Sequence, residues 1–577
     1  MVSILAVALG LSAAAGTLGS PTVPLGRRAG QTATVVIPSP DATVLGNVMN
    51  GVESFGGIPY AEPPTGQLRL KPPKRRTEPL GTFDATGPAG ACPQFLSSTE
   101  SQDFLFKLLG TIANLPFVQE VTGQSEDCLT ITVARPEGTT SEDKLPVLYW
   151  IFGGGFEVMP SLGWSSMYDG TSLVNYGVEI GRPFVFVAVN YRVGGYGFMP
   201  GKEIEQEGSG NAGLLDQRMG LEWVADNIAA FGGDPDKVTI WGESAGSISV
   251  YAQMALFDGD IEYGGKALFR GAIMSSGSAV PTNPLSSDRG QAVYDQVVDA
   301  GGCAGADDTL ACLRALSAED FLSATTAVPH LLSYSSLALS YVPRPDGRTL
   351  TDSMDALVLA NKYAPVPMIV GDCEDEGTLF ALFQPNLTTP AELADYLHQY
   401  YFGAATPALL EDLIATYGTG IAAVTDNSPF GTGLLNEVFP GFKQRAAILG
   451  DLVFTLTRRL FLTVTAGVNP DTPSWSYLLS QNKGTPILGT FHASDLLQVF
   501  YGVNDNYAAK SMRSYFINFV YSLDPNGDGD TGFPDWPRWD EAHEMAHVSA
   551  GSSSILADNF REDSYNWIVD NLAILRL

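Results

Sequence analysis

Unbroken apolar runs alternate with amphipathic stretches along most of this chain. Helical stretches such as Gly213 to Ala230 lie between the runs. Short apolar runs of this kind are typical of strands that are buried on both faces of a sheet. Strands that alternate with helices predict a mostly parallel sheet flanked by helices, an α/β fold. The predicted strands lie at residues 145–154, 184–192, 238–242, 271–277, 367–372 and 474–479.

The region before these runs has a different pattern. Within residues 32–59, apolar and polar positions alternate in short segments such as TVVIP and TVLGNV. This alternation predicts a small antiparallel sheet near the N-terminus. Because no repeat, low-complexity tract or linker divides the chain, we expect one α/β catalytic domain over residues 29–577, with large insertions.

The N-terminal sequence MVSILAVALGLSAAAG indicates export. Its apolar core of roughly a dozen residues is too short to span a bilayer, and small residues follow it, as in a secretory signal peptide. We expect the signal peptide to cover residues 1–20, and Arg27-Arg28 is a candidate second processing site. The best later apolar run, residues 453–468, is interrupted by Arg458 and Arg459. The mature protein is therefore expected outside the cell.

Charge and cysteine content narrow the class of protein further. The 63 acidic residues exceed the 32 basic ones and give a net charge of −31, spread along the chain. Such a surface repels phosphate backbones, so we expect no nucleic-acid partner. Asn386-Leu387-Thr388 is a glycosylation acceptor sequence. In an exported chain, two disulfides and one free thiol are expected from five cysteines, which are Cys92, Cys128, Cys303, Cys312 and Cys373.

A candidate nucleophile lies between a predicted strand and a predicted helix. Residues 238–241, VTIW, lead directly into Gly242-Glu243-Ser244-Ala245-Gly246, and a helical stretch follows. A serine on such a tight turn has a strained backbone, and glycines two residues away on either side remove the clashes. The turn also directs a helix N-terminus at the reacting centre. An ordinary Gly/Ser turn is the alternative, and the strand and helix argue against it.

A second glycine-rich segment precedes the candidate nucleophile. Ile151-Phe152-Gly153-Gly154-Gly155-Phe156 follows a predicted strand. Bare glycines allow backbone N–H groups to approach a tetrahedral oxyanion, and the N–H of Ala245 is expected to be the third donor. A plain glycine turn is the alternative for this segment.

Several motifs in order resemble the type-B carboxylesterase/lipase family, which is cholinesterase-like, and most closely its branch of secreted fungal lipases and sterol esterases. The motifs span nearly the whole mature chain and include FGGIPYAEPPTGQLRLKPP (55–73), SEDCLTITV (125–133), WIFGGGFEVM (150–159), the long segment 210–246 that ends in GESAG, GDCEDEGT (371–378) and GTFHASDL (489–496). The resemblance implies an α/β-hydrolase fold and ester hydrolysis without a cofactor or metal.

The resemblance also implies roles for individual residues. Ser244 matches the family's nucleophile, Glu376 its acid and His492 its base, while Gly154, Gly155 and Ala245 match its oxyanion donors. From the residues alone, Asp372, Glu374 and Asp375 compete with Glu376, and the resemblance selects Glu376. The order serine, acid, histidine is the one expected on this fold. The family's disulfides imply the pairs Cys92–Cys128 and Cys303–Cys312, which leaves Cys373 unpaired.

The same resemblance suggests the substrate class. Fungal lipases of the family carry a lid between the first two cysteines, where this chain has the apolar segment Phe104 to Val118. Such a segment can contact a lipid interface, whereas permanent packing on the core is the alternative. Tryptophan is absent from residues 92–128, which disfavours choline esters. We expect a lipase or sterol esterase that acts on long acyl esters. One alternative is a carboxylesterase for short or soluble esters. The other is a binding module without catalytic activity, which the intact triad disfavours.

Three further patterns are judged to be coincidental. His543-Glu544-Met545-Ala546-His547 matches a zinc-protease pattern but follows a Pro/Trp-rich loop. Residues 524–535 resemble a calcium loop but contain Pro534 and lack the terminal glutamate. Residues 208–213, GSGNAG, mimic a dinucleotide fingerprint without a preceding strand.

Overall fold

A large, strongly mixed sheet forms the centre of the molecule. The computed structural model describes residues 32–94, 124–158, 170–529 and 532–576. Six parallel strands lie side by side in the order β7-β6-β8-β11-β12-β13. They correspond to the six apolar runs of the sequence and confirm the predicted parallel sheet. Their bounds are β6 Leu145–Ile151, β7 Val185–Val189, β8 Gly233–Glu243, β11 Gly271–Ser275, β12 Met368–Cys373 and β13 Ser474–Leu479.

Antiparallel strands extend this sheet at both edges. The alternating segments near the N-terminus form antiparallel strands, as predicted, and these strands continue the large sheet because β3 pairs with β5 and β5 with β7. At the other edge β14 pairs parallel with β13 and antiparallel with β15. The edge strands are β1 Thr32–Pro38, β2 Asp41–Met49, β3 Val52–Pro59, β4 Gly81–Asp84, β5 Thr130–Pro136, β14 Glu544–Val548 and β15 Ser553–Ala557, and β9 Glu262–Tyr263 with β10 Lys266–Ala267 forms a separate pair.

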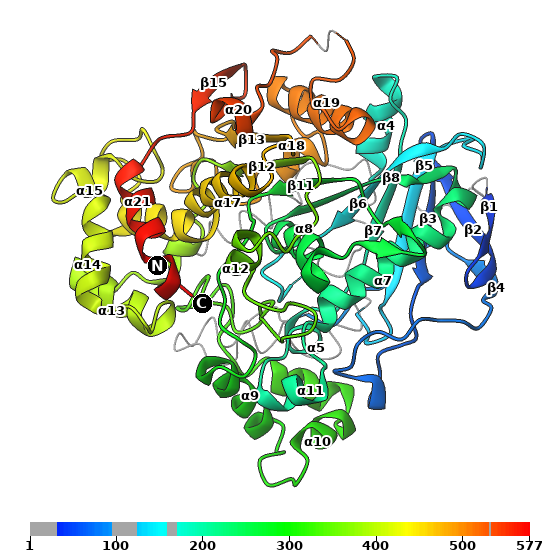
Figure 1. Cartoon of the computed structure of the whole chain (residues 1–577), viewed down its shortest axis with the longest axis horizontal. Helices are drawn as coiled ribbons and strands as arrows, with labels where there is room; N and C mark the ends of the chain where they lie inside the picture. Colours follow the sequence, from blue (N-terminus) through cyan, green and yellow to red (C-terminus); the bar gives the residue numbers. More distant parts are fainter. Residues whose placement is uncertain (1–31, 95–123, 159–169, 530–531, 577) are drawn as a thin grey trace, which may run out of the picture.

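Helices cover the sheet on its two sides. In Figure 1 the strands run between one group that includes α7 (Ala212–Asn227) and α8 (Ala245–Ala255) and another that includes α4 (Thr171–Glu179) and α19 (Tyr507–Ser522). The predicted helix over 213–230 is α7 together with a short 3-10 turn. The remaining longer helices are α9 Asp288–Ala300, α11 Ala318–Thr325, α13 Pro390–Tyr400, α14 Pro407–Thr416, α16 Phe442–Gly450, α17 Leu456–Val468 and α21 Glu562–Asn571.

Aromatic packing fixes α19 against the central strands. Trp241 of β8 lies 4.5 Å from Trp150 of β6 and 5.5 Å from Phe516 of α19, measured between ring centroids. All three side chains are buried. Such aromatic contacts add to the free energy gained from burying apolar area. The carboxyl ends of β6 and β8 are thereby packed together and against α19.

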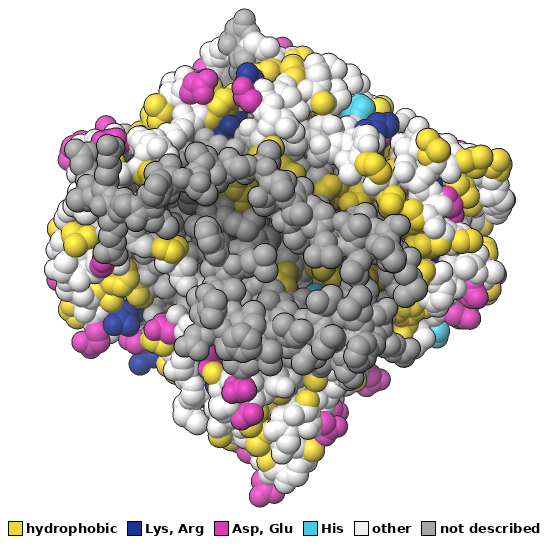
Figure 2. Space-filling model, turned by 180° about the vertical axis from the view of Figure 1, so that it is seen from behind, with side chains coloured by type: hydrophobic (Ala, Val, Ile, Leu, Met, Phe, Trp, Pro, Cys, Tyr) yellow, Lys and Arg dark blue, Asp and Glu magenta, His cyan; other side chains and the backbone are white. Residues whose placement is uncertain are grey.

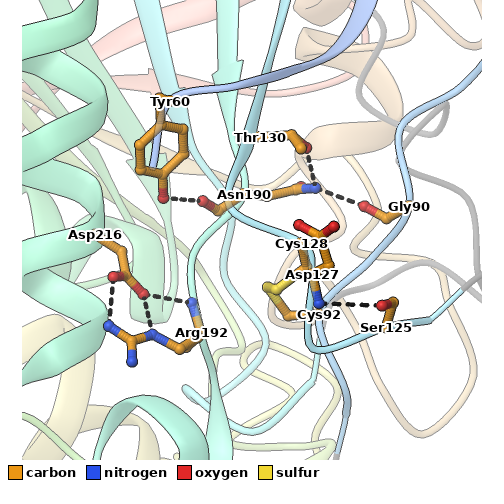
Figure 3. The surroundings of a disulfide bond; sticks show 10 residues. All are labelled: Tyr60, Gly90, Cys92, Ser125, Asp127, Cys128, Thr130, Asn190, Arg192 and Asp216. Atoms are coloured by element: carbon orange, nitrogen blue, oxygen red, sulfur yellow. Dashed lines mark hydrogen bonds and ion pairs between the residues drawn. A yellow bond between two sulfur atoms is a disulfide. The ribbon is translucent and has the colours of Figure 1, made fainter. Parts of the chain in front are cut away.

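Both implied disulfides are present, and Cys373 is a buried free thiol. Figure 3 shows how the Cys92–Cys128 bond is joined to the sheet. The side chain of Asn190, just after β7, donates to the carbonyl of Gly90 at 2.7 Å and to the hydroxyl of Thr130 at 3.1 Å. The disulfide and these hydrogen bonds hold both ends of the segment between Cys92 and Cys128. The predicted lid, Phe104 to Val118, lies outside the described residues, as does the predicted signal peptide.

No helix within the described ranges is long and apolar enough to cross a membrane. Residues 453–468 are the best later candidate for a membrane span in the sequence. They form the end of a π-helical turn, Asp451–Thr455, and then helix α17, about half of which is buried. Figure 2 shows acidic side chains scattered over several parts of one face, in keeping with an evenly acidic surface.

Candidate active site

Ser244 occupies a sharp turn between β8 and α8. Its backbone has φ 59° and ψ −125°, a conformation that is costly for a residue with a side chain. A Cβ atom on Gly242 would lie 2.2 Å from the carbonyl oxygen of Gly246, and one on Gly246 would lie 2.1 Å from that of Ile151. Both glycines are therefore required by close backbone approach, which explains the spacing of the GESAG sequence.

Ser244, His492 and Glu376 form a continuous chain of hydrogen bonds. The Nε2 atom of His492 lies 2.8 Å from the Ser244 hydroxyl, and its Nδ1 atom lies 2.5 Å from a carboxylate oxygen of Glu376. The other oxygen of Glu376 accepts the backbone N–H of Cys373 at 2.7 Å. Ser244 follows β8 and Glu376 follows β12, so both lie at the carboxyl edge of the parallel sheet, where α/β folds place their ligands.

The acids near Glu376 have other partners. Asp372 binds Arg458 at 2.8 Å, and Glu374 lies 3.3 Å from Lys483. The carboxylate of Asp375 accepts hydrogen bonds from Ser428, Phe430 and Thr490. Of the four carboxylates that the residues alone left open, the structure brings Glu376 within hydrogen-bond distance of His492.

A second carboxylate faces the same imidazole. Glu243 lies 3.4 Å from Nε2 of His492, and Asp495 also acts on the site electrostatically. Burial lowers the pKa of His492, but the charges of Glu376 and Glu243 outweigh it and raise the pKa to about 9. Burial raises the pKa of Glu243 to about 8 and that of Asp495 to about 7. Perturbed groups of this kind cluster at catalytic centres. Glu243 is not among the site residues predicted from the sequence, although its place directly before Ser244 indicates a position near the nucleophile.

The glycine loop lies beside Ser244. Gly154 has φ 108° and Gly155 has φ 65°, conformations that favour glycine. A Cβ on Gly154 would lie 2.0 Å from the carbonyl oxygen of Val158, and one on Gly153 would lie 2.3 Å from that of Glu243. The backbone can therefore approach Ser244 only because these side chains are missing. Gly154, Gly155 and Ala245, at the start of α8, all line the cavity that contains Ser244.

This cavity is mainly apolar and has a volume of about 870 Å³, including open solvent at its mouth. Its lining includes Glu243, Ser244 and His492, which lie next to one another. A π-helical turn supplies Val453 and Phe454 to its wall. A segment that the sequence analysis did not single out, residues 331–339, contributes four leucines: Leu331, Leu332, Leu337 and Leu339.

The coincidental patterns play no part in this site. Residues 544–547 of the zinc-protease pattern lie on strand β14 and not on a helix. The first residue of the pattern, His543, comes directly before this strand and has φ 52°. Within the described residues, no group of three histidine, cysteine or acidic side chains is placed to hold a metal ion. The GSGNAG segment follows helix α6 (Lys202–Glu207) and not a strand. Asn386 of the acceptor sequence is exposed, and its amide donates to the Tyr334 hydroxyl at 2.9 Å.

A serine, a histidine and a glutamate that meet beside a glycine loop at the carboxyl edge of a parallel sheet define the ester-cleaving class of α/β-hydrolases. The model of the Carboxylesterase family matches residues 31–567. The chain belongs to the Carboxylesterase family and is a carboxylic ester hydrolase.

Known relatives are similar over nearly their whole length. A secreted triacylglycerol lipase of Gibberella zeae is 59% identical over 94% of this chain and 91% of its own, and a secreted lipase of Botryotinia fuckeliana is 53% identical over 95% of both. The solved structure of Aspergillus niger EstA has a TM-score of 0.78 at 27% identity and covers 94% of this chain and 99% of its own.

Proposed function

We propose that the protein hydrolyses esters through an acyl-enzyme formed on Ser244. His492 accepts the hydroxyl proton as the Ser244 oxygen attacks the ester carbonyl, and Glu376 orients the imidazole and stabilises its charged form. The observation that carries this proposal is the unbroken chain from Ser244 through His492 to Glu376, with contacts of 2.8 and 2.5 Å, where Ser244 and His492 line a mainly apolar cavity.

The backbone N–H groups of Gly154, Gly155 and Ala245 are proposed to bind the oxyanion of the tetrahedral intermediate. Each such donor contributes about 3 kcal/mol of transition-state stabilisation. As the C–O bond breaks, His492 gives its proton to the departing alcohol. Water then attacks the acyl-serine by the same route, and the acid product leaves. The proposed reaction uses no cofactor.

We further propose that the acyl group is long and apolar. The cavity wall is built largely from leucine, valine and phenylalanine side chains, which gain hydrophobic free energy when they enclose a hydrocarbon chain. The names of the two fungal relatives, both lipases, support the same class of substrate. A lipase or sterol esterase is therefore the leading proposal. Contact of Phe104 to Val118 with a lipid interface stays a prediction.

The enzyme is secreted, as the names of both fungal relatives state for those proteins. Removal of residues 1–20, further processing after Arg28 and glycosylation of Asn386 are proposals that accompany export. The exposed position of Asn386 supports glycosylation, because an attached glycan needs free space. Mass spectrometry of the secreted protein would test all three.

Covalent labelling tests the role of Ser244. A phosphonate ester is expected to form one adduct on Ser244 and to abolish hydrolysis, whereas Ser244→Ala should remain folded, fail to label and lose about 10⁴-fold or more in kcat. Hydrolysis by Ser244→Ala at the wild-type rate would contradict the proposal. A wild-type protein that neither labels nor hydrolyses esters would instead favour a binding module.

Nitrophenyl esters of increasing acyl length test the substrate class. We expect kcat/KM to rise from acetate to esters of long acids, because each buried methylene contributes about 0.8 kcal/mol. A maximum at acetate or butyrate would favour the alternative, a carboxylesterase for short or soluble esters.

A further inference from the structure

The glycine loop ends in a buried carboxyl group that the proposed mechanism does not use. Glu157 follows Phe156 and is fully buried. Its nearest basic neighbour in the described part of the chain is His330, whose Nε2 atom lies 3.9 Å from the carboxylate. Burial raises the pKa of Glu157 to about 8, against the effect of two backbone N–H groups. A carboxyl group in such surroundings destabilises a fold unless its contacts compensate for the lost hydration.

The contacts of Glu157 join two walls of the cavity. One carboxylate oxygen accepts the backbone N–H of Leu331 at 2.8 Å, and the nearby backbone N–H of Ser340 acts on the group to lower its pKa. Leu331 begins the segment 331–339 that carries the four leucines of the cavity wall, and Ser340 directly follows it. The Ser340 hydroxyl donates to the carbonyl of Pro329 at 2.8 Å, so the base of this segment is closed as a loop.

The leucine segment also touches the glycine loop directly. A Cβ on Gly155 would lie 2.9 Å from a methyl carbon of Leu331, which leaves no free space between them. Within the loop, the N–H of Val158 donates to the carbonyl of Gly154 at 3.0 Å, and Phe156 has φ 59°. A displacement of Leu331 therefore acts on the backbone that carries the proposed oxyanion donors.

We propose that Glu157 is a positioning residue that holds the leucine segment 331–339 against the glycine loop, and thereby sets both the oxyanion geometry and the fit of the acyl chain. Glu157 acts through Leu331 and does not touch the ester. This inference rests on the proposed hydrolysis at Ser244 and deepens it.

The titratable groups that face Glu157 are His330 and Tyr341. The Nδ1 atom of His330 accepts the N–H of Leu332 at 3.0 Å, which places a ring hydrogen on Nε2, toward Glu157. The Tyr341 hydroxyl donates to the carbonyl of Thr325, and burial raises the pKa of Tyr341 well above its ordinary value, so it stays neutral. Above pH 8 Glu157 ionises and places a negative charge close to the glycine loop. The oxyanion is proposed to form beside the same loop, and the two negative charges repel each other, so ionised Glu157 opposes catalysis.

Two substitutions separate this role from plain structural support. Glu157→Gln keeps an oxygen that can accept the N–H of Leu331 but cannot ionise, and Glu157→Leu keeps the volume but removes the acceptor. Glu53→Leu is the control for loss of a buried carboxylate, and it also removes the ion pair of Glu53 with Arg135 at 2.6 Å. Glu53 is also buried at 8% exposure and accepts a backbone N–H, that of Gly138 at 3.1 Å, but lies on the distant strand β3.

Steady-state kinetics on short and long nitrophenyl esters, from pH 6 to 9.5, give the readout. We expect Glu157→Leu to lower kcat about tenfold and to change the ratio of kcat/KM between long and short esters. Glu157→Gln should rescue most of kcat at pH 7, and its kcat/KM relative to the wild type should rise above pH 8, where Glu157 of the wild type ionises. Glu53→Leu should lower the Tm and leave the long-to-short ratio unchanged.

The proposal is overturned if Glu157→Leu and Glu53→Leu both lower the Tm and leave the ester ratio as in the wild type. If Glu157→Leu does not fold, Glu157→Gln decides, since a ratio of its kcat/KM to that of the wild type that stays constant from pH 7 to 9.5 would also overturn the proposal. Phosphonate labelling of Ser244 in each variant distinguishes this outcome from failure of the proposed hydrolysis, in which the wild type itself would neither label nor turn over.

Discussion

At the scale of single residues, each polar side chain of the site depends on a specific partner. Glu376 is fixed by the backbone N–H of Cys373 and so presents its other oxygen to His492. The acids around it, including Asp372 and Asp375, are engaged elsewhere. The order and number of acids in the sequence could not show this, because the choice between neighbouring carboxylates depends on which backbone amides and arginines each one meets.

Glu243 makes the pH dependence of activity testable. His492 must be neutral to accept the proton of Ser244, and the charges of Glu376 and Glu243 raise its pKa against the effect of burial. Glu243→Gln removes one of these charges, so the pKa of His492 should fall and the acid limb of kcat/KM should move to lower pH. The measurement is a kcat/KM profile from pH 5 to 10 with a soluble ester, a range that includes the raised pKa of His492. A limb that stays in place or moves to higher pH would contradict this account.

At the scale of elements, the glycine loop and the turn at Ser244 combine positive φ angles with close backbone approach. The sequence predicted both turns correctly because glycine spacing reports such geometry directly. It could not predict the leucine segment 331–339, which has no strand or helix period and approaches the site only through tertiary contacts. The same holds for the π-helical turn Asp451–Thr455, since a π-turn has no distinctive local sequence.

Alanine substitutions in the glycine loop should differ in severity. In Gly154→Ala the new Cβ would lie 2.0 Å from the backbone carbonyl oxygen of Val158. In Gly155→Ala it would lie 2.9 Å from a methyl carbon at the end of the Leu331 side chain, which can shift more easily than backbone. We expect kcat/KM to fall about 10³-fold in the first variant and about tenfold in the second. Gly138→Ala is the control, because Gly138 has φ 83° but no atom within 4 Å of the new Cβ. Equal activity in the two loop variants would refute this ranking.

The two disulfides should contribute unequally to stability. The Cys92–Cys128 bond closes a separation of 36 residues and the Cys303–Cys312 bond one of 9. Loop-closure entropy then assigns about 3.8 kcal/mol to the first and about 2.6 kcal/mol to the second. Replacing both cysteines of each pair by serine should lower the Tm more for the longer loop. A larger drop on loss of Cys303–Cys312 would show that native contacts, and not chain entropy, dominate.

At the scale of the whole molecule, the sequence specified the central sheet well. Each of the six apolar runs became a parallel strand, since strands buried on both faces are apolar at most positions. The sequence did not show that the N-terminal antiparallel strands would join the same sheet, because the pairing of β3 with β5 links residues about 70 to 84 positions apart, from Pro59 with Thr130 to Val52 with Pro136. Such long-range pairing leaves no local pattern.

Buried carboxyl groups should also govern how the stability of the molecule depends on pH. Burial raises the pKa of Glu157 and Glu243 to about 8 and of Asp372 and Asp495 to about 7. In the unfolded chain these groups titrate near pH 4. Between about pH 4 and 8 the folded state therefore binds more protons than the unfolded state, and its stability falls as the pH rises.

One buried acid has the opposite effect. Asp558 is held by Arg458 and Arg459, whose charges outweigh burial and lower its pKa to about 2, so its stabilising contribution is lost as the pH falls from about 4 to 2. Together with a net charge of −31 at pH 7, these shifts place the maximum of stability at mildly acidic pH. The Tm should peak near pH 4 to 5, and Glu157→Gln should make its decline toward pH 8 shallower. A Tm that rises steadily from pH 5 to 8 would mean that these carboxyl groups are already ionised in the folded protein.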